Sequence, residues 1–138
     1  FTERTINSVY DLRGVTYGNG LFVTVGSPKT IITSSDGNSW TERILFLTSR
    51  SLTGVTYGNG LFVVVGYSGI ILTSSDGNSW TERTSGTYKH LYGVTYGNGL
   101  FVTVGNSGTI LTSSDNGTTW TSRTSGTTQH LYGVTYSQ

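Results

Sequence analysis

The pattern of apolar and polar positions predicts short β-strands that recur along the chain. Residues 12–17 (LRGVTY) combine β-branched and aromatic residues and lead into a Gly-Asn-Gly sequence, which is typical of a tight hairpin turn. Residues 21–26 (LFVTVG) are apolar on both faces, which indicates a strand between two packed layers. A third strand is predicted at 30–35 and a fourth from Trp40 onward, in the letters WTER. No stretch has a sustained 3.6-residue period, so no helix of consequence is expected.

The same pattern is then repeated. Trp40, Trp80 and Trp120 are spaced by 40 residues, and each closes a near-copy of one sequence unit. Four antiparallel strands in a repeat of about 40 residues are typical of a β-propeller blade. The sequence therefore predicts an all-β protein, a β-propeller built from four-stranded antiparallel blades in one domain, 1–138. The expected parts are three full blades and two terminal strands: blades near 12–43, 52–83 and 91–123, a fourth-type strand at 1–5 and a first-type strand at 131–136.

The turn before each tryptophan narrows the kind of blade. Residues 113–120 read Ser-Ser-Asp-Asn-Gly-Thr-Thr-Trp, which resembles the Asp-box, Ser-x-Asp-x-Gly-x-Thr-Trp, of sialidase-like and photosystem-assembly-factor-like propellers. The turns at 34–40 and 74–80 are variants that are one residue shorter between the aspartate and the tryptophan. The resemblance covers the chain as repeats and implies the propeller fold, while the box itself occurs in proteins of unrelated function.

The residues of the box have a structural interpretation. An aspartate in a turn accepts hydrogen bonds from backbone N–H groups, and a tryptophan after it shields those bonds from water. A calcium site is disfavoured because each loop has one carboxylate, whereas hard cations take several oxygen ligands. We therefore expect no metal and no cofactor, and a structural role for six residues: Asp36, Trp40, Asp76, Trp80, Asp115 and Trp120.

Composition removes several classes of partner. Charged residues make up 11% of the chain, the net charge is +1 and the eight basic residues form no patch, so nucleic acid and anionic membranes are not expected partners. No apolar run approaches the roughly 20 residues of a membrane span. The absence of cysteine excludes disulfides and thiolate metal sites.

The absence of methionine suggests a processed product, an excised fragment or an incompletely identified sequence. An extracellular or cell-surface location is our expectation, although composition does not fix the compartment.

No set of residues predicts catalysis. A common glycosidase needs two carboxylates across one bond, and a sialidase adds a cluster of arginines. All the acidic residues except Asp11 occupy repeat-equivalent positions, and the arginines that follow the fourth-strand aromatic residue are spread around the rim. His90 and His130 are repeat equivalents without a supporting serine and acid. A non-enzymatic protein is therefore predicted, and glycoside hydrolysis is the least favoured alternative.

Differences among the copies point to a binding face. The YGNG and SSDGN turns scarcely change and should share one face, whereas the connections on the opposite face vary. Loops on a rigid scaffold commonly carry binding sites. Aromatic and hydrogen-bonding side chains of these variable loops are the candidates for contacting a glycan or a protein: Tyr10, Phe46, Arg50, Tyr67, Tyr88 and His90. Drift of unconstrained loops would give the same variation, and the apolar run at 44–47 is equally suited to a subunit contact.

Blade number gives the last prediction. Ordinary propellers close with four to eight blades, so a three-blade arc leaves apolar blade faces uncovered. We therefore expect self-association as a dimer or head-to-tail assembly, or excision from a longer propeller. The function predicted is a non-catalytic, self-associating propeller module that binds glycan or protein. The alternative is a purely structural subunit, natural or engineered, that forms rings or filaments.

Overall fold

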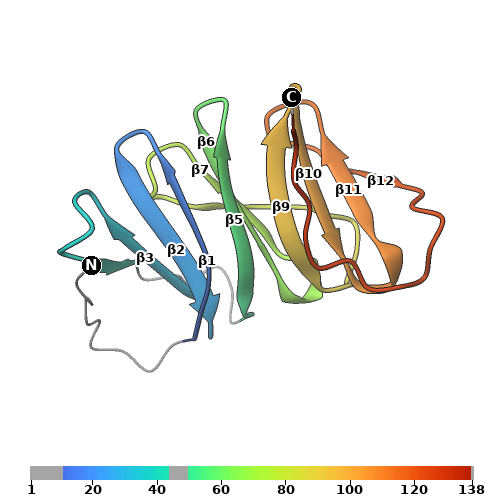
Figure 1. Cartoon of the computed structure of the whole chain (residues 1–138), viewed down its shortest axis with the longest axis horizontal. Helices are drawn as coiled ribbons and strands as arrows, with labels where there is room; N and C mark the ends of the chain where they lie inside the picture. Colours follow the sequence, from blue (N-terminus) through green and yellow to red (C-terminus); the bar gives the residue numbers. More distant parts are fainter. Residues whose placement is uncertain (1–10, 44–49, 138) are drawn as a thin grey trace.

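Three four-stranded antiparallel sheets stand side by side in the computed structural model (Figure 1). The structure describes residues 11–43 and 50–137. Within each sheet the strands pair in the order in which they occur along the chain, as expected for propeller blades. The first blade consists of β1 (Asp11–Gly18), β2 (Leu21–Ser27), β3 (Thr30–Ser34) and β4 (Thr41–Arg43). The predicted all-β propeller class is confirmed.

The other two blades repeat this arrangement. The second consists of β5 (Leu52–Gly58), β6 (Leu61–Gly66), β7 (Ile71–Ser74) and β8 (Thr81–Arg83). The third consists of β9 (Leu91–Gly97), β10 (Leu100–Gly105), β11 (Ile110–Ser113) and β12 (Thr121–Arg123). The only helical segments in the described part of the chain are two three-residue 3-10 turns, η1 (Tyr67–Gly69) and η2 (Asn106–Gly108). None of its helices is long and apolar enough to cross a membrane.

The core lies between the blades, because the second strand of each blade is apolar on both faces. On β6, Phe62 and Val64 belong to a buried cluster shared with the first blade, while Val63 and Val65 belong to one shared with the third. Successive side chains of a strand point to opposite faces, so one strand contributes to two cores. The strand between two packed layers was predicted at residues 21–26; its copy in the second blade, β6, has that position, whereas Val23 and Val25 of β2 contribute to one buried cluster.

The innermost strands pack closely through glycine. A Cβ atom on Gly58 of β5 would lie 2.3 Å from the ring of Tyr96 on β9, and one on Gly18 of β1 would lie 2.1 Å from the ring of Tyr57. Glycine at the end of each first strand therefore leaves room for a tyrosine of the next blade. This contact recurs at both blade interfaces and sets the spacing of the inner strands.

The prediction of a strand at 131–136 is wrong. The segment is not assigned to a ladder, because no described strand pairs with it in the way that β10 pairs with β9. It nevertheless packs on β9 as a following blade would: a Cβ on Gly97 would meet the Tyr136 ring at 2.2 Å. In Figure 1 this red segment runs beside β9. The other predicted terminal strand, at 1–5, lies outside the described residues.

Candidate functional site

The two ends of the blades carry different sets of turns. At one end, the Asn59 side chain in the β5–β6 turn donates to the Asn116 side chain in the Asp-box of the next blade, at 3.1 Å. At the other end, the η1 turn meets the connection between β8 and β9, where the Ser68 N–H donates to His90 Nδ1 at 2.9 Å. The repeated turns and the variable connections are therefore on opposite faces. We call these the Asp-box face and the variable face.

The Asp-box residues hold their turns as the sequence indicated. Asp76 accepts hydrogen bonds from the N–H groups of Asn78 and Ser79 at 2.8 and 2.9 Å, and the Trp80 indole donates to the Gly77 carbonyl at 3.2 Å. Asp36 and Trp40 make the same bonds in the first blade. Gly77 has a φ of 77°, which glycine adopts without steric cost. The shorter boxes are thus complete turns.

The longer box closes differently. Asn116 and Gly117 both have positive φ, 63° and 81°, which accommodates the additional residue. Asp115 accepts from both the backbone N–H and the hydroxyl of Thr119. These bonds stabilise the ionised carboxylate and lower its pKa from 3.8 to about 2. The pKa values of Asp36 and Asp76 are also lowered, chiefly by the backbone N–H groups of Ser39 and Ser79.

A row of aromatic and basic side chains crosses the variable face. The Tyr67 ring stacks on His90 with centroids 4.2 Å apart, and the Arg13 guanidinium carbon lies 5.8 Å from the Tyr67 centroid. Tyr92 continues the row to Tyr132, at a centroid distance of 4.9 Å. The pKa of Tyr92 is raised, first by burial and then by the neighbouring tyrosines. The row joins all three blades and the segment at 131–136, so Tyr67 and His90 already have structural partners.

β-Bulges place two members of that row. The pairing of β1 with β2 skips from Leu12 to Gly14, which leaves Arg13 unpaired, and the pairing of β9 with β10 leaves out Tyr92 in the same way. A bulge redirects a side chain out of the regular alternation. Sequence reasoning missed Arg13 and Tyr92. The signal available was only that both precede the repeated Gly-Val-Thr-Tyr sequence.

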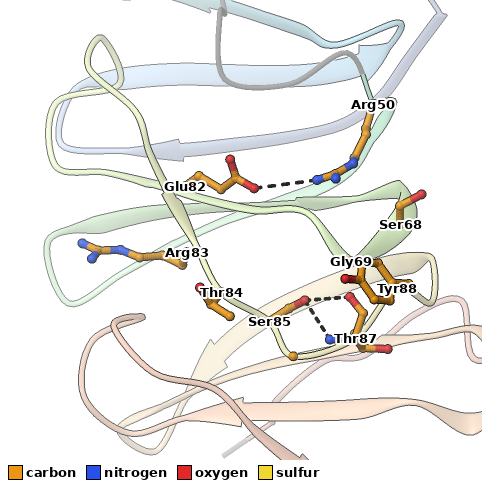
Figure 2. Close-up of a pocket in the computed structure, with 10 residues that line it drawn as sticks. Arg50, Ser68, Gly69, Glu82, Arg83, Thr84, Ser85, Thr87 and Tyr88 are labelled. Atoms are coloured by element: carbon orange, nitrogen blue, oxygen red, sulfur yellow. Dashed lines mark hydrogen bonds and ion pairs between the residues drawn. The ribbon is translucent and has the colours of Figure 1, made fainter.

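A cleft of about 450 Å³ opens beside this row (Figure 2). Arg50 and Glu82 form an ion pair across it at 3.7 Å, and the Tyr88 side chain is 88% exposed. The remaining walls come from η1, the end of β8 and the connection after it: Ser68, Gly69, Arg83, Thr84, Ser85, Gly86 and Thr87. Figure 2 shows the Arg83 side chain directed away from Tyr88. The Arg83 Nε instead donates to the Thr73 hydroxyl at 3.1 Å.

The structure brings four of the six predicted ligand-contacting residues to one area. Arg50 and Tyr88 line the cleft, and Tyr67 and His90 stack beside it. Tyr10 and Phe46 lie outside the described residues. Glu82 was missed because its place in the repeat suggested a scaffold position, whereas its pairing with Arg50 depends on a contact between β8 and the residues just before β5.

A second cleft of about 580 Å³ occupies the equivalent place one blade further on. Its walls are formed by Gly108, the end of β12 and the segment after it: Arg123, Thr124, Ser125, Gly126, Thr127 and Thr128. No cluster of three or more histidine, cysteine, aspartate or glutamate side chains that would suit a metal ion occurs among the described residues.

Comparison with known families agrees with this architecture. The model of the DUF6242 β-propeller domain matches residues 2–131. The chain belongs to the DUF6242 β-propeller domain family. The predicted resemblance to photosystem-assembly-factor-like blades is confirmed as well, because two of the solved structures similar to this DUF6242 domain are YCF48 propellers. No curated protein matches the sequence.

The two YCF48 structures resemble the DUF6242 domain in fold. YCF48 bound to a D1 peptide superposes with a TM-score of 0.74 at 22% identity, covering 85% of this chain and 42% of the YCF48 chain. YCF48 from Cyanidioschyzon merolae gives a TM-score of 0.72 at 19% identity, with 86% and 38% covered. The DUF6242 chain therefore spans less than half the length of these propellers.

Proposed function

We propose that this chain is a non-catalytic binding module whose variable face takes a glycan or a protein ligand. The observation that carries the proposal is the cleft between the η1 turn and the β8–β9 connection. Its walls come largely from the connections of the variable face, and it presents an exposed tyrosine together with an ion pair. Such loops on a rigid scaffold are suited to recognition. We extend the proposal to an extracellular or cell-surface location.

The similar propeller supports a macromolecular ligand. One YCF48 structure contains a D1 peptide, so a propeller of this kind can bind another chain. The identity of 22% supports the common fold, and the nature of the ligand for this chain rests on its own loops.

The carboxylates in the cleft favour binding over glycoside hydrolysis. Glu82 is the one carboxylate among the residues that line the first cleft, and it is paired with Arg50. The second cleft has no acidic residue in its lining. Hydrolysis by the common mechanisms uses two carboxylates on either side of the bond.

Self-association is a second part of the proposal, supported by the exposed side of β1. Leu12, Val15 and Tyr17 are 47%, 64% and 57% exposed, whereas the equivalent Leu52 in the second blade is fully buried. A second copy that covers this side would bury apolar surface, which favours association.

Light scattering tests the self-association. It should give the mass of a dimer or a larger assembly, and Val15→Glu should return the protein to a monomer. A monomeric wild-type protein would contradict this part. Rings or filaments without any ligand would favour the purely structural subunit.

The binding proposal is tested on parallel glycan and peptide arrays. We expect the wild-type chain to bind members of one array, and Arg50→Ala with Tyr88→Ala to remove that binding. Asn78→Ala, an exposed change on the Asp-box face, is the matched control and should bind like the wild type. Equal binding by the wild type and the double variant would place the ligand site elsewhere. No binding on either array would contradict the proposal.

A further inference from the structure

The two clefts are built from copies of one loop. In the first, the Thr87 N–H donates to the Ser85 hydroxyl at 3.3 Å and the Lys89 N–H donates to the Thr87 hydroxyl at 3.1 Å. In the second, the Thr127 N–H donates to the Ser125 hydroxyl at 3.2 Å and the Gln129 N–H donates to the Thr127 hydroxyl at 3.1 Å. The central glycines, Gly86 and Gly126, have φ of 82° and 84°. The backbone of the two loops is therefore the same.

Each loop is seated on a turn of its own blade. A Cβ atom on Gly69 would lie 2.0 Å from the Thr87 carbonyl oxygen, and one on Gly108 would lie 2.0 Å from the Thr127 carbonyl oxygen. Such close approach leaves the loops little room to shift, so both clefts are formed before a ligand arrives. Preformed sites avoid the entropic cost of ordering a loop on binding.

The walls of the clefts are hydroxyl-rich. Apart from glycines, arginines, Glu82 and Tyr88, every lining residue is a serine or threonine: Ser68, Thr84, Ser85 and Thr87 in the first cleft, and Thr124, Ser125, Thr127 and Thr128 in the second. Neither lining includes an aliphatic side chain. A peptide docks on a sheet edge, in an apolar groove or on a charge cluster. Hydroxyl-lined clefts of this kind instead match a ligand that itself carries many hydroxyl groups.

Two positions distinguish the clefts. Glu82 pairs with Leu72 in the β7–β8 ladder, and Ser122 pairs with Leu111 in the β11–β12 ladder, so glutamate in the first blade pair corresponds to serine in the second. Tyr88 corresponds likewise to Thr128, since both follow the Thr-Ser-Gly-Thr sequence. The first cleft therefore has a carboxylate acceptor and an exposed ring that the second lacks, and it has Arg50 in addition to the arginine that each cleft contains, Arg83 or Arg123.

We propose that the two clefts are subsites for one neutral oligosaccharide. They occupy corresponding places in successive blades, and the first binds sugar more tightly than the second. This inference rests on the proposed binding function. Arg50 and Glu82 offset each other's charge and offer donors and acceptors to sugar hydroxyls, and Tyr88 provides a flat face for the apolar side of a sugar ring. Ligands that extend over both subsites gain from the second contact without new loop ordering.

Exchange of the distinguishing residues tests the inference. Cellohexaose, maltohexaose, xylohexaose and mannohexaose would be titrated separately into the protein while the backbone amide signals of Gly86 and Gly126 are followed by NMR. For at least one sugar, the Gly86 signal should shift at lower concentration than the Gly126 signal. The double change Ser122→Glu with Thr128→Tyr should lower the dissociation constant at Gly126 about tenfold, the scale of one aromatic contact. Both positions are exposed, so the fold should be retained.

The reverse exchange and a control complete the experiment. Glu82→Ser with Tyr88→Thr should weaken binding at Gly86 by a similar factor, and Asn78→Ala should change neither signal. Sugar binding that shifts neither glycine, or an exchange that leaves both constants unchanged, would overturn the inference. Absence of sugar binding with positive peptide binding that depends on Arg50 and Tyr88 would overturn it as well, yet leave the proposed function standing. Absence of both kinds of binding would overturn the two together.

Discussion

The Asp-box face and the variable face are carried by the same blades, yet they are stabilised in different ways. On the Asp-box face, each turn is closed by bonds within itself, such as those that the backbone N–H groups of Asn78 and Ser79 donate to Asp76. On the variable face, local bonds such as that from the Thr87 N–H to the Ser85 hydroxyl are joined by contacts with neighbouring segments, such as the stacking of Tyr67 on His90. Local closure allows a turn to be copied unchanged from blade to blade. Closure between blades makes each connection depend on its neighbours, which is where copies diverge and where clefts form.

The largest effect is expected in the core that both faces share. Phe62 is fully buried between the first two blades, so Phe62→Ala should lower the free energy of unfolding by about 3–5 kcal/mol. Asn78→Ala, at an exposed position, should change it by less than about 0.5 kcal/mol. Urea unfolding followed by tryptophan fluorescence measures both. A loss of less than 1 kcal/mol for Phe62→Ala would mean that the blades do not stabilise one another through this core.

The next largest effect on stability is expected in an Asp-box turn, which is held by hydrogen bonds within itself. Asp76→Ala leaves the N–H groups of Asn78 and Ser79 without their acceptor and should cost about 0.5–1.5 kcal/mol of unfolding free energy, since water can reach these exposed groups. Asp76→Asn keeps a side-chain oxygen and should cost less. Equal losses for the two variants would show that the negative charge, rather than the hydrogen-bond acceptor, stabilises the turn.

Acid should affect the Asp-box face in a defined window of pH. The folded pKa of Asp115 is about 2, below its usual 3.8, so the stabilisation from this carboxylate is fully present above pH 3.8 and is lost as the pH falls toward 2. Thr119→Val removes the hydroxyl bond, the largest cause of the shift, and should raise the pKa of Asp115. Carboxyl-carbon NMR titration measures this directly. A pKa that is unchanged in the variant would contradict the assigned cause.

Much of the scaffold was predictable because its determinants are local. The second strand of each blade has an apolar pattern on both faces, and in the middle blade the side chains of LFVVVG (Leu61–Gly66) divide between two cores. The Gly-Asn-Gly turns and the Asp-box turns require glycine or asparagine at positions with positive φ angles, and these residues can be recognised in the sequence. The fourth strand begins at Thr41 instead of Trp40, since the Trp40 indole turns back to the Gly37 carbonyl.

The variable face was less predictable because its contacts join residues far apart in the chain. Arg13 reaches Tyr67 because a bulge redirects its side chain, and Glu82 on β8 pairs with Arg50, which lies just before β5. The repeat shows the positions of these residues, but it does not show which residues pair. The segment 131–136 has the sequence of a first strand, but a strand is defined by its pairing partner, and the described residues provide none.

The smallest effect on stability is expected at Tyr88, an exposed residue of the variable face that can be compared with Tyr67, which contacts neighbouring segments. Its side chain is 88% exposed, so Tyr88→Ala should change the free energy of unfolding by no more than about 0.5 kcal/mol. Tyr67→Ala removes the stacking on His90 and the contact with Arg13, and should cost more, about 1–2 kcal/mol. Thermal and urea unfolding of the two variants would measure the difference. If Tyr88→Ala were as destabilising as Tyr67→Ala, Tyr88 would belong to the contacts that hold the blades together, and a ligand would lose its aromatic surface at the first cleft. A neutral effect on stability leaves that ring available for binding, because an exposed side chain that contributes nothing to the fold can contact a ligand without weakening the scaffold.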